Sequence, residues 1–451
     1  MPFDRYGTEL STDSSEAVCA FEAAVHGVAA HRPSTANALE RALRADPNLV
    51  AAHALKGFAN VILARQELVP VARESHRAAS AALKTRGGSV CEHALTDALA
   101  HAIGGCFFAA ADRIEAYLEE SPHTFLAAKL AHALRFMMGD ARGMLAITSR
   151  VLPHWGESHP GYGFLLGCHA FALEEGADFG GAEQAGRRAV ALEPDDAWGL
   201  HAVSHVHEMA GRVDEGIAWL ESSRPVWKAC NNFSFHMAWH LALFYLERED
   251  HEAVLRLYDA EVRPAPTDDF RDVANAVSLL WRLEQDGVAV GHRWAELREI
   301  ALKRRRDLTL TFAALHHLLT LIAAGEDAAA RELAAELAAR AASRDGTDQA
   351  TVMDRVGRDL AMVLLDASRT GPIGRLPLQR LASELRCIGG SHAQRDVFVR
   401  TLAGLAADWG DRRSLESILA LRRSLKREDR FARETLSRLE AAERRLARRR
   451  A

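Results

Sequence analysis

The feature that most restricts the fold of this chain is a spacing of about 34 to 38 residues that recurs through its first half. The same packing position is occupied in turn by Ala110, Met144, Ala182, Gly216 and Ala253. A period of this length is typical of units made of two helices joined by a tight turn. One such pair cannot hide its apolar face, whereas stacked pairs share a continuous core and coil into a superhelix with a concave side.

Turn and stop residues specify the kind of repeat. The tetratricopeptide pattern needs a small residue at the turn and a proline that ends the unit. Gly105 and Pro122 fit these positions in one unit, Ala177 and Pro194 fit them in another, and an earlier half-unit ends at Pro47. Ala, Leu, Glu and Arg also dominate the chain, and these residues favour helix over sheet. We therefore predict an all-α, tetratricopeptide-type helical-repeat superhelix, an α-α solenoid.

The fit to the repeat divides the chain into three expected regions. Residues 1–85 hold N-terminal helices and a degenerate repeat, and residues 86–262 hold the central tetratricopeptide-like repeats. Residues 263–451 keep helical spacing and turn signals, at Gly287 and Gly325 for example, and are expected to be divergent C-terminal helical repeats. The arginine-rich end continues a helical pattern from about Phe431.

Charge and composition exclude several classes of partner. The 451 residues carry a net charge of -5, so no overall basic field favours nucleic acid or anionic lipid. The first residues lack a secretion signal, and no later segment has the roughly 18 apolar residues that span a bilayer. The six cysteines show no C-x-x-C spacing. We expect a cytoplasmic protein with reduced thiols that contacts neither membrane nor nucleic acid.

Histidines concentrate in two adjacent predicted helices. With Gly211 at the turn of its unit, His201, His205 and Glu208 fall on first-helix positions that face the concave groove. Spacings of four and three residues stack these side chains along one stripe. His236 and His240 form a second pair, four residues apart, on the next first helix, and the two stripes can converge in the groove.

Three interpretations of this histidine region remain open. Two imidazoles four residues apart beside a carboxylate can hold a divalent metal such as zinc. The candidate ligands are His201, His205, His236 and His240. A neutral imidazole beside a carboxylate can also act as a general acid or base. The third interpretation is a set of buried histidines bonded to backbone and to one another. The catalytic candidates are therefore His201, His205, Glu208, His236 and His240.

Two further groups are candidates for substrate binding. Trp198 and Trp239 lie beside the histidines in sequence and could line a pocket for an organic ligand. Tryptophans at such positions also belong to the hydrophobic core. In residues 387–398, Ser391 is expected to cap a helix whose first turns carry Gln394, Arg395 and Asp396. A helix N-terminus beside an arginine suits a carboxylate or phosphate. The alternative is a structural network that includes Arg395 and Asp396.

Three motifs resemble a known family. The first is an Asp-Ala-Trp sequence followed by His-x-x-x-His and Glu-Met, and the second is His-x-x-Trp-His. The third is Gly-Gly-Ser-x-Ala-Gln-Arg-Asp. They comprise Asp196, Ala197, Trp198, His201, His205, Glu208 and Met209, then His236, Trp239 and His240, then Gly389, Gly390, Ser391, Ala393, Gln394, Arg395 and Asp396. Over nearly its whole length the chain resembles the tetratricopeptide repeat protein 38 family. The resemblance implies a helical-repeat fold and names no substrate.

Two functions compete on this evidence. In the first, the solenoid encloses a His-rich pocket for a small anionic organic ligand and works as a hydrolase or lyase, by acid/base or metal-assisted chemistry. In the second, it is a non-enzymatic tetratricopeptide scaffold that binds a peptide or protein in its groove. A third possibility is a structural dimer with no ligand, and a homodimer is expected because residues 328–342 and the terminal helix offer amphipathic surface.

Overall fold

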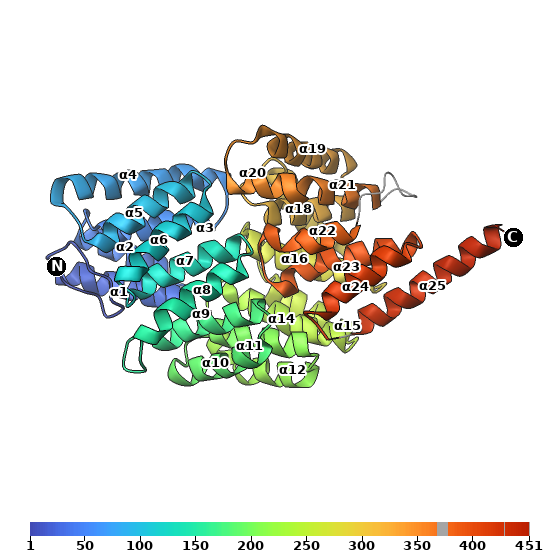
Figure 1. Cartoon of the computed structure of the whole chain (residues 1–451), viewed down its shortest axis with the longest axis horizontal. Coiled ribbons are helices and arrows are strands. Elements are labelled where there is room, and N and C mark those ends of the chain that lie inside the picture. Colours follow the sequence, from blue (N-terminus) through green and yellow to red (C-terminus); the bar gives the residue numbers. More distant parts are fainter. Residues whose placement is uncertain (368–377, 428, 451) are drawn as a thin grey trace. The chain divides into compact units, whose positions relative to one another are not determined.

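The computed structural model describes residues 1–367, 378–427 and 429–450, and within these ranges the chain is built from helices (Figure 1). Extended pairing in the described ranges is limited to one bridge between Phe3 and Glu9. The predicted all-α class is confirmed, whereas the tetratricopeptide type of the repeats stays a prediction.

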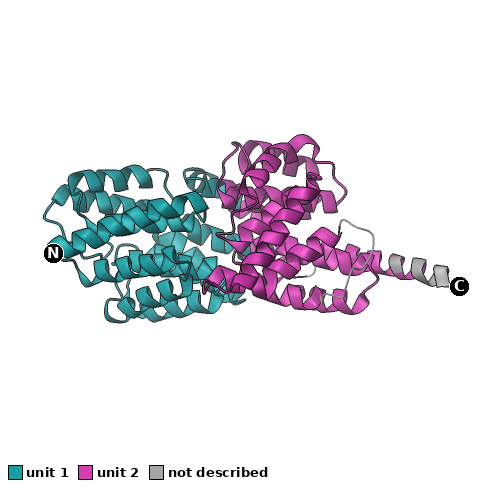
Figure 2. Ribbon diagram, turned by 90° about the horizontal axis from the view of Figure 1, so that it is seen from above, with its two compact units in different colours: residues 1–206, 220–234 teal, residues 207–219, 235–451 magenta. Residues whose placement is uncertain are grey.

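The chain divides into two compact units, coloured separately in Figure 2. Unit 1 comprises residues 1–206 and 220–234, and unit 2 comprises residues 207–219 and 235–451. The three sequence ranges proposed above concern repeat type and stay a prediction. The helices that lie wholly in unit 1 are α1 Ser15–Ala29, α2 Thr35–Ala45, α3 Val50–Ile62, α4 Val69–Arg86, α5 Val90–Ile103, α6 Phe107–Glu120, α7 Phe125–Met137, α8 Ala141–Val151, α9 Tyr162–Glu175, α10 Phe179–Leu192 and α13 Arg224–Lys228.

Helices α11 Ala197–Ala210, α12 Val213–Ser222 and α14 Phe233–Glu247 each contribute residues to both units. Unit 2 continues with α15 His251–Leu257, α16 Phe270–Gln285, α17 Trp294–Arg304, α18 Thr311–Ala323, α19 Asp327–Ser343, α20 Asp348–Val352, α21 Arg358–Ala367, α22 Leu378–Glu384, α23 His392–Asp408, α24 Arg412–Arg423 and α25 Arg430–Arg450. Helix α25 confirms the helical pattern expected for the arginine-rich end. Consecutive helices pack as antiparallel pairs, for example α1 with α2 and α9 with α10.

A short turn of constant design joins several of these pairs. The first helix ends at a residue with positive φ, and the next residue is an aspartate that caps the second helix. In the turn between α7 and α8, Gly139 has φ 64° and the Asp140 side chain accepts a hydrogen bond from the Gly143 amide. The turn between α9 and α10 repeats this with Ala177 at φ 67° and Asp178. Because the cap satisfies an amide that the helix leaves unpaired, the aspartate fixes where each second helix begins.

The small residues of the period lie where a second helix meets a first helix. Ala110 and Ala182 are fully buried. At Gly216 in α12, an added Cβ atom would lie 2.2 Å from the ring of Phe244 in α14. The chain approaches so closely there that even a methyl group is excluded, which explains the small residue in this register.

Three smaller expectations have an outcome in the structure. Ser391 caps α23 as expected, and its side chain accepts a hydrogen bond from the Gln394 amide. The six cysteines are free. Within the described ranges, no helix has both the length and the apolar character needed to cross a bilayer.

Candidate metal centre

Helix α11 carries the first pair of histidines. It is the first helix of the α11 and α12 hairpin and is followed by the turn residue Gly211, where φ is 68°. His201 and His205 are 1% and 0% exposed, and their Nε2 atoms lie 3.0 Å apart. The placement of both residues on a first helix agrees with the repeat register predicted from the sequence.

Helix α14 carries the second pair in the same arrangement. His236 and His240 lie one turn apart, are 9% and 0% exposed, and bring their Nε2 atoms to 3.2 Å. Asn275 on α16 lies against the outer side of this pair, with its Oδ1 atom 3.1 Å from His236 Nδ1. The amide oxygen can accept a proton carried by Nδ1, so this contact favours the tautomer of His236 that is protonated there.

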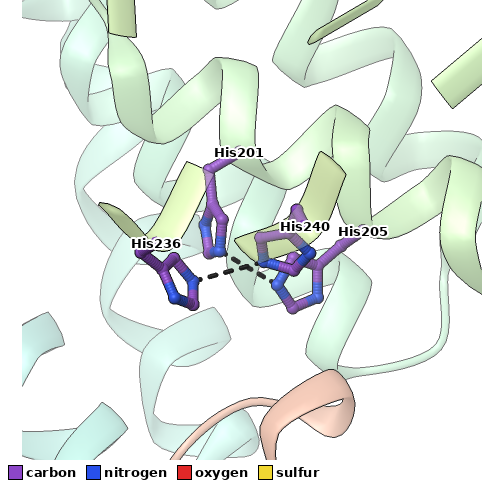
Figure 3. Close-up of side chains that lie close together, drawn as sticks. All are labelled: His201, His205, His236 and His240. Carbon is purple, nitrogen blue, oxygen red and sulfur yellow. Dashed lines mark hydrogen bonds between the residues drawn. The ribbon is translucent and has the colours of Figure 1, made fainter. Parts of the chain in front are cut away.

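The four imidazoles converge. One ring nitrogen from each of His201, His205, His236 and His240 lies within 4.8 Å of the other three, and Figure 3 shows the rings turned toward a common centre. In a tetrahedral zinc site with Zn–N bonds of about 2.05 Å, neighbouring nitrogens lie about 3.3 Å apart. The spacing within each pair is close to that value.

Two buried glutamates lie behind the ligand rings. Glu174 at the end of α9 places an Oε atom 3.3 Å from His205 Nδ1, and Glu208 at the end of α11 places one 3.4 Å from His240 Nδ1. Each glutamate precedes the positive-φ turn residue of its hairpin, Ala177 or Gly211, by three positions. The two carboxylates are therefore equivalent in successive repeats, and each reaches a histidine of the next first helix.

These oxygen atoms influence which ring nitrogen holds the proton. Oxygen atoms beside Nδ1 of His205, His236 and His240 favour protonation there and leave Nε2 with a lone pair. Two such lone pairs about 3 Å apart repel each other unless a proton or a cation lies between them. The arrangement is that of metal ligands held by an outer shell of carboxylates, which also raises the basicity of the rings.

Two buried histidines elsewhere in the chain, His132 and His316, have different partners. His132 contacts the Cys168 carbonyl at 3.1 Å, and burial, reinforced by Lys129, lowers its pKa to about 3. His316 donates from Nδ1 to the Phe312 carbonyl at 2.8 Å, and burial lowers its pKa to about 3 as well. These are neutral core histidines satisfied by backbone, and the four histidines of the cluster face one another instead.

Sequence reasoning did not identify Glu174, Glu175 or Asn275 as part of the site. Glu174, Glu175 and His205 form a second set of buried groups whose ligand atoms also lie within 4.8 Å of one another. The one signal in the sequence is that Glu174 occupies the register of Glu208 in the preceding repeat. Asn275 gave no signal, because it lies on a helix two hairpins away from His201.

The two tryptophans of the predicted site pack against the histidine rings. Trp198 lies 4.9 Å from His201 and 4.8 Å from Phe171 between ring centroids. Trp239 stacks on His236 at 5.3 Å, and its Nε1 donates to Ser278 Oγ. Both tryptophans are buried, so they fix ring orientation and exclude water. Their contact with a substrate stays a prediction.

The C-terminal motif forms the start of α23. Gln394 completes a capping box with Ser391, and Arg395 donates to the Gly390 carbonyl and contacts His392 Nδ1 at 3.0 Å. Asp396 receives a two-pronged ion pair from Arg422 on α24, at 2.7 and 3.1 Å. The ion pair and the positive charge of Arg422 hold the pKa of Asp396 far below its ordinary range despite the burial of the carboxylate. These contacts anchor α23, and a role for the motif in binding an anion stays a prediction.

A scan against protein-family models finds no match to the chain. The resemblance to the tetratricopeptide repeat protein 38 family therefore stays a prediction.

Proposed function

We propose that this chain binds one divalent transition metal ion, with zinc as the first candidate, through His201, His205, His236 and His240. The observation that carries the proposal is the convergence of four buried ring nitrogens within 4.8 Å. Oxygen acceptors behind three of the rings support it, because they leave the inward nitrogens unprotonated.

The charges in the site are consistent with a divalent ion. Four neutral imidazoles leave the full double charge on the metal, and a charge of this size is very costly to bury alone. The carboxylates of Glu174 and Glu208, which are 0% and 7% exposed, supply two negative charges just outside the ligands. Metal, ligands and carboxylates together form a neutral group suited to a buried position.

The donor set of four imidazoles without a thiolate suits a catalytic metal when one of the ligands can exchange. Structural zinc sites are closed by four protein ligands and are rich in cysteine thiolates, whereas catalytic sites keep three protein ligands and an open fourth position. Imidazole ligands keep the ion electrophilic, as required to polarise a carbonyl or to activate water. His236, the most exposed ligand at 9%, is the one that a substrate or water would join or displace. This supports the finer proposal of a hydrolase or lyase acting on a small anionic organic molecule.

Metal binding is tested by elemental analysis of the purified protein and by titration of the metal-free protein with Co²⁺, whose visible absorption reports nitrogen ligands. We expect one equivalent of metal, and loss of the Co²⁺ bands in the double variant His205→Ala/His240→Ala. The matched control is His93→Ala, which removes an exposed imidazole. The same stoichiometry in the wild type and the double variant would rule the site out.

The catalytic use is tested separately. Metal-loaded protein is assayed against carboxylic esters, amides and phosphomonoesters, together with the variants His236→Ala and Arg395→Gln. Loss of turnover in His236→Ala with metal still bound supports catalysis, and a raised KM in Arg395→Gln supports an anionic substrate. A loaded protein that turns over none of these substrates but binds peptides favours the alternative, a non-enzymatic tetratricopeptide scaffold.

A further inference from the structure

A cavity of about 190 Å³ lies within unit 2, where α11 and α14 end and α25 begins. The Arg427 amide donates to the Met209 carbonyl at 2.8 Å, and the Arg430 amide donates to Glu247 Oε1 at 3.2 Å. The charged residues that line the cavity are Glu208, Glu247, Lys426, Arg427, Asp429, Arg430 and Arg433.

The acidic residues of this lining already have cationic or amide partners. Glu208 receives Lys426 Nζ at 3.2 Å, and Asp429 receives two hydrogen bonds from Arg422, at 2.6 and 2.8 Å. Glu247 accepts the amide of Arg430. The negative charge of the cavity is therefore compensated from within the protein.

Two arginines in the lining have no acidic partner among the described residues. Arg427 and Arg433 are both exposed, and their guanidinium groups make no hydrogen bond or ion pair with any residue in the described ranges. Arg427 is held in place by its backbone bond to α11, and its side chain passes Gly211, where a Cβ atom would lie 3.6 Å from Arg427 Cδ. Arg430 is committed to an ion pair with Asp286. The cavity is therefore lined by two guanidinium groups that have no partner in the described ranges. They lie beside Lys426, which is paired with Glu208.

We propose that this cavity binds a phosphate group, free or carried on a small molecule, through Arg427 and Arg433. A guanidinium group matches phosphate oxygens with two parallel hydrogen bonds, and two guanidinium groups balance a dianion. Free phosphate fits easily within about 190 Å³. The binding does not require a metal at the histidine cluster.

The position of this site also connects it to the proposed metal centre. Lys426 Nζ lies 3.2 Å from Glu208, whose other oxygen lies 3.4 Å from His240 Nδ1. A phosphate in the cavity competes with Glu208 for Lys426 and leaves that carboxylate to His240. Bound phosphate therefore strengthens metal binding, and this second step rests on the proposed function.

The test is calorimetric titration of the metal-free full-length protein with inorganic phosphate, with sulfate and malonate as comparison anions. We expect saturable binding of phosphate, and an affinity at least about tenfold lower in the double variant Arg427→Gln/Arg433→Gln, because both guanidinium groups and their charged hydrogen bonds are lost. The matched control Arg423→Gln removes an exposed arginine at the end of α24, outside the cavity, and should bind phosphate as the wild type does.

Absence of saturable phosphate binding, equal binding by the double variant, or equal loss in Arg423→Gln would each overturn the proposal. Tighter binding of malonate than of phosphate would indicate that the ligand is a dicarboxylate, and this result would also overturn the proposal. Failure of the metal site does not alter these results, because the titration contains no metal. Conversely, Arg427→Gln/Arg433→Gln should still bind one equivalent of Co²⁺, so the two failures can be told apart.

Discussion

At the scale of single residues, two repeat-equivalent glutamates orient the candidate ligands. Glu174 and Glu208 occupy the same position in successive first helices, and each faces Nδ1 of a histidine on the following first helix. A carboxylate in this place fixes the tautomer, turns the ring and raises its basicity as a ligand. The metal centre is therefore built from two copies of one local arrangement.

Replacing Glu174 by glutamine should weaken metal binding by about 10- to 100-fold, the usual cost of losing an outer-shell carboxylate. The amide keeps the size of the side chain and removes the negative charge beside His205. Competition titration of metal-free protein against a chelating dye gives the affinity.

Glu175→Gln is the informative comparison for this variant, because Glu175 belongs to the second set of candidate ligands with Glu174 and His205. If the four histidines hold the ion, Glu175→Gln should retain nearly normal affinity. An equal loss in both variants would place the ion on the glutamate pair and contradict the four-histidine site.

Asp196, the residue before α11, gives a prediction about pH. Burial raises the pKa of its carboxyl from 3.8 to about 7, and Lys129 only partly opposes this effect. The folded state thus binds a proton more tightly than the unfolded state, so the stability conferred by the protonated group is full below about pH 4 and is lost as pH rises through about 7. Asp196→Asn keeps the size of the side chain without the ionisation.

Asp196→Asn should therefore gain stability relative to the wild type between about pH 5 and pH 8, with an upper limit of about 4 kcal/mol for a shift of this size. Urea denaturation of both proteins at about pH 5 and at about pH 8 measures the difference in free energy of unfolding between variant and wild type. A stability difference that stays constant with pH would show that Asp196 ionises freely in the folded protein.

At the scale of helices and turns, the hairpin design explains why the small residues recur. Several second helices begin at an aspartate cap, as α10 does at Asp178, and the second helix α12 makes a close contact with a first helix at Gly216, against the ring of Phe244. A Cβ atom at Gly216 would lie 2.2 Å from that ring, and Phe244 is buried and cannot swing away freely.

Gly216→Ala should destabilise the protein by about 1 to 2 kcal/mol, because overpacking costs about 1 to 3 kcal/mol and helix propensity returns up to about 1. The control is Gly180→Ala in α10, where the nearest atom to the new Cβ lies 4.0 Å away and a gain of up to about 1 kcal/mol is expected. Denaturation midpoints of both variants measure these changes in stability. A stabilised Gly216→Ala variant would contradict the close packing.

At the scale of the whole molecule, metal binding should increase the stability of the folded protein. An ion that binds only the folded chain adds about 2.7 kcal/mol when its free concentration is about 100 times Kd. Calorimetry with zinc and then with excess chelator should show a reversible fall in Tm. The fall should become smaller as the pH is lowered, because protons compete with the metal for the imidazole nitrogens, and it should vanish in His205→Ala/His240→Ala. An unchanged Tm on chelation of the wild type would mean that no ion is coupled to folding.

The sequence by itself determined the features that depend on local spacing. The 34- to 38-residue period, the turn at Gly211 and the cap at Ser391 each follow from the conformational needs of a few neighbouring residues. The same spacing placed His201 and His205 on one face of a first helix, because residues four apart on a helix lie one above the other.

Tertiary structure decided the contacts that cross from one helix to another. That Glu174 faces His205, that Asn275 faces His236 and that Arg422 pairs with Asp396 all depend on how far successive hairpins are displaced along each other. Hydrophobic packing of the whole stack sets that displacement, and packing is not directional at the level of one residue. No local pattern near Glu174 or Asn275 therefore indicates which histidine it will meet.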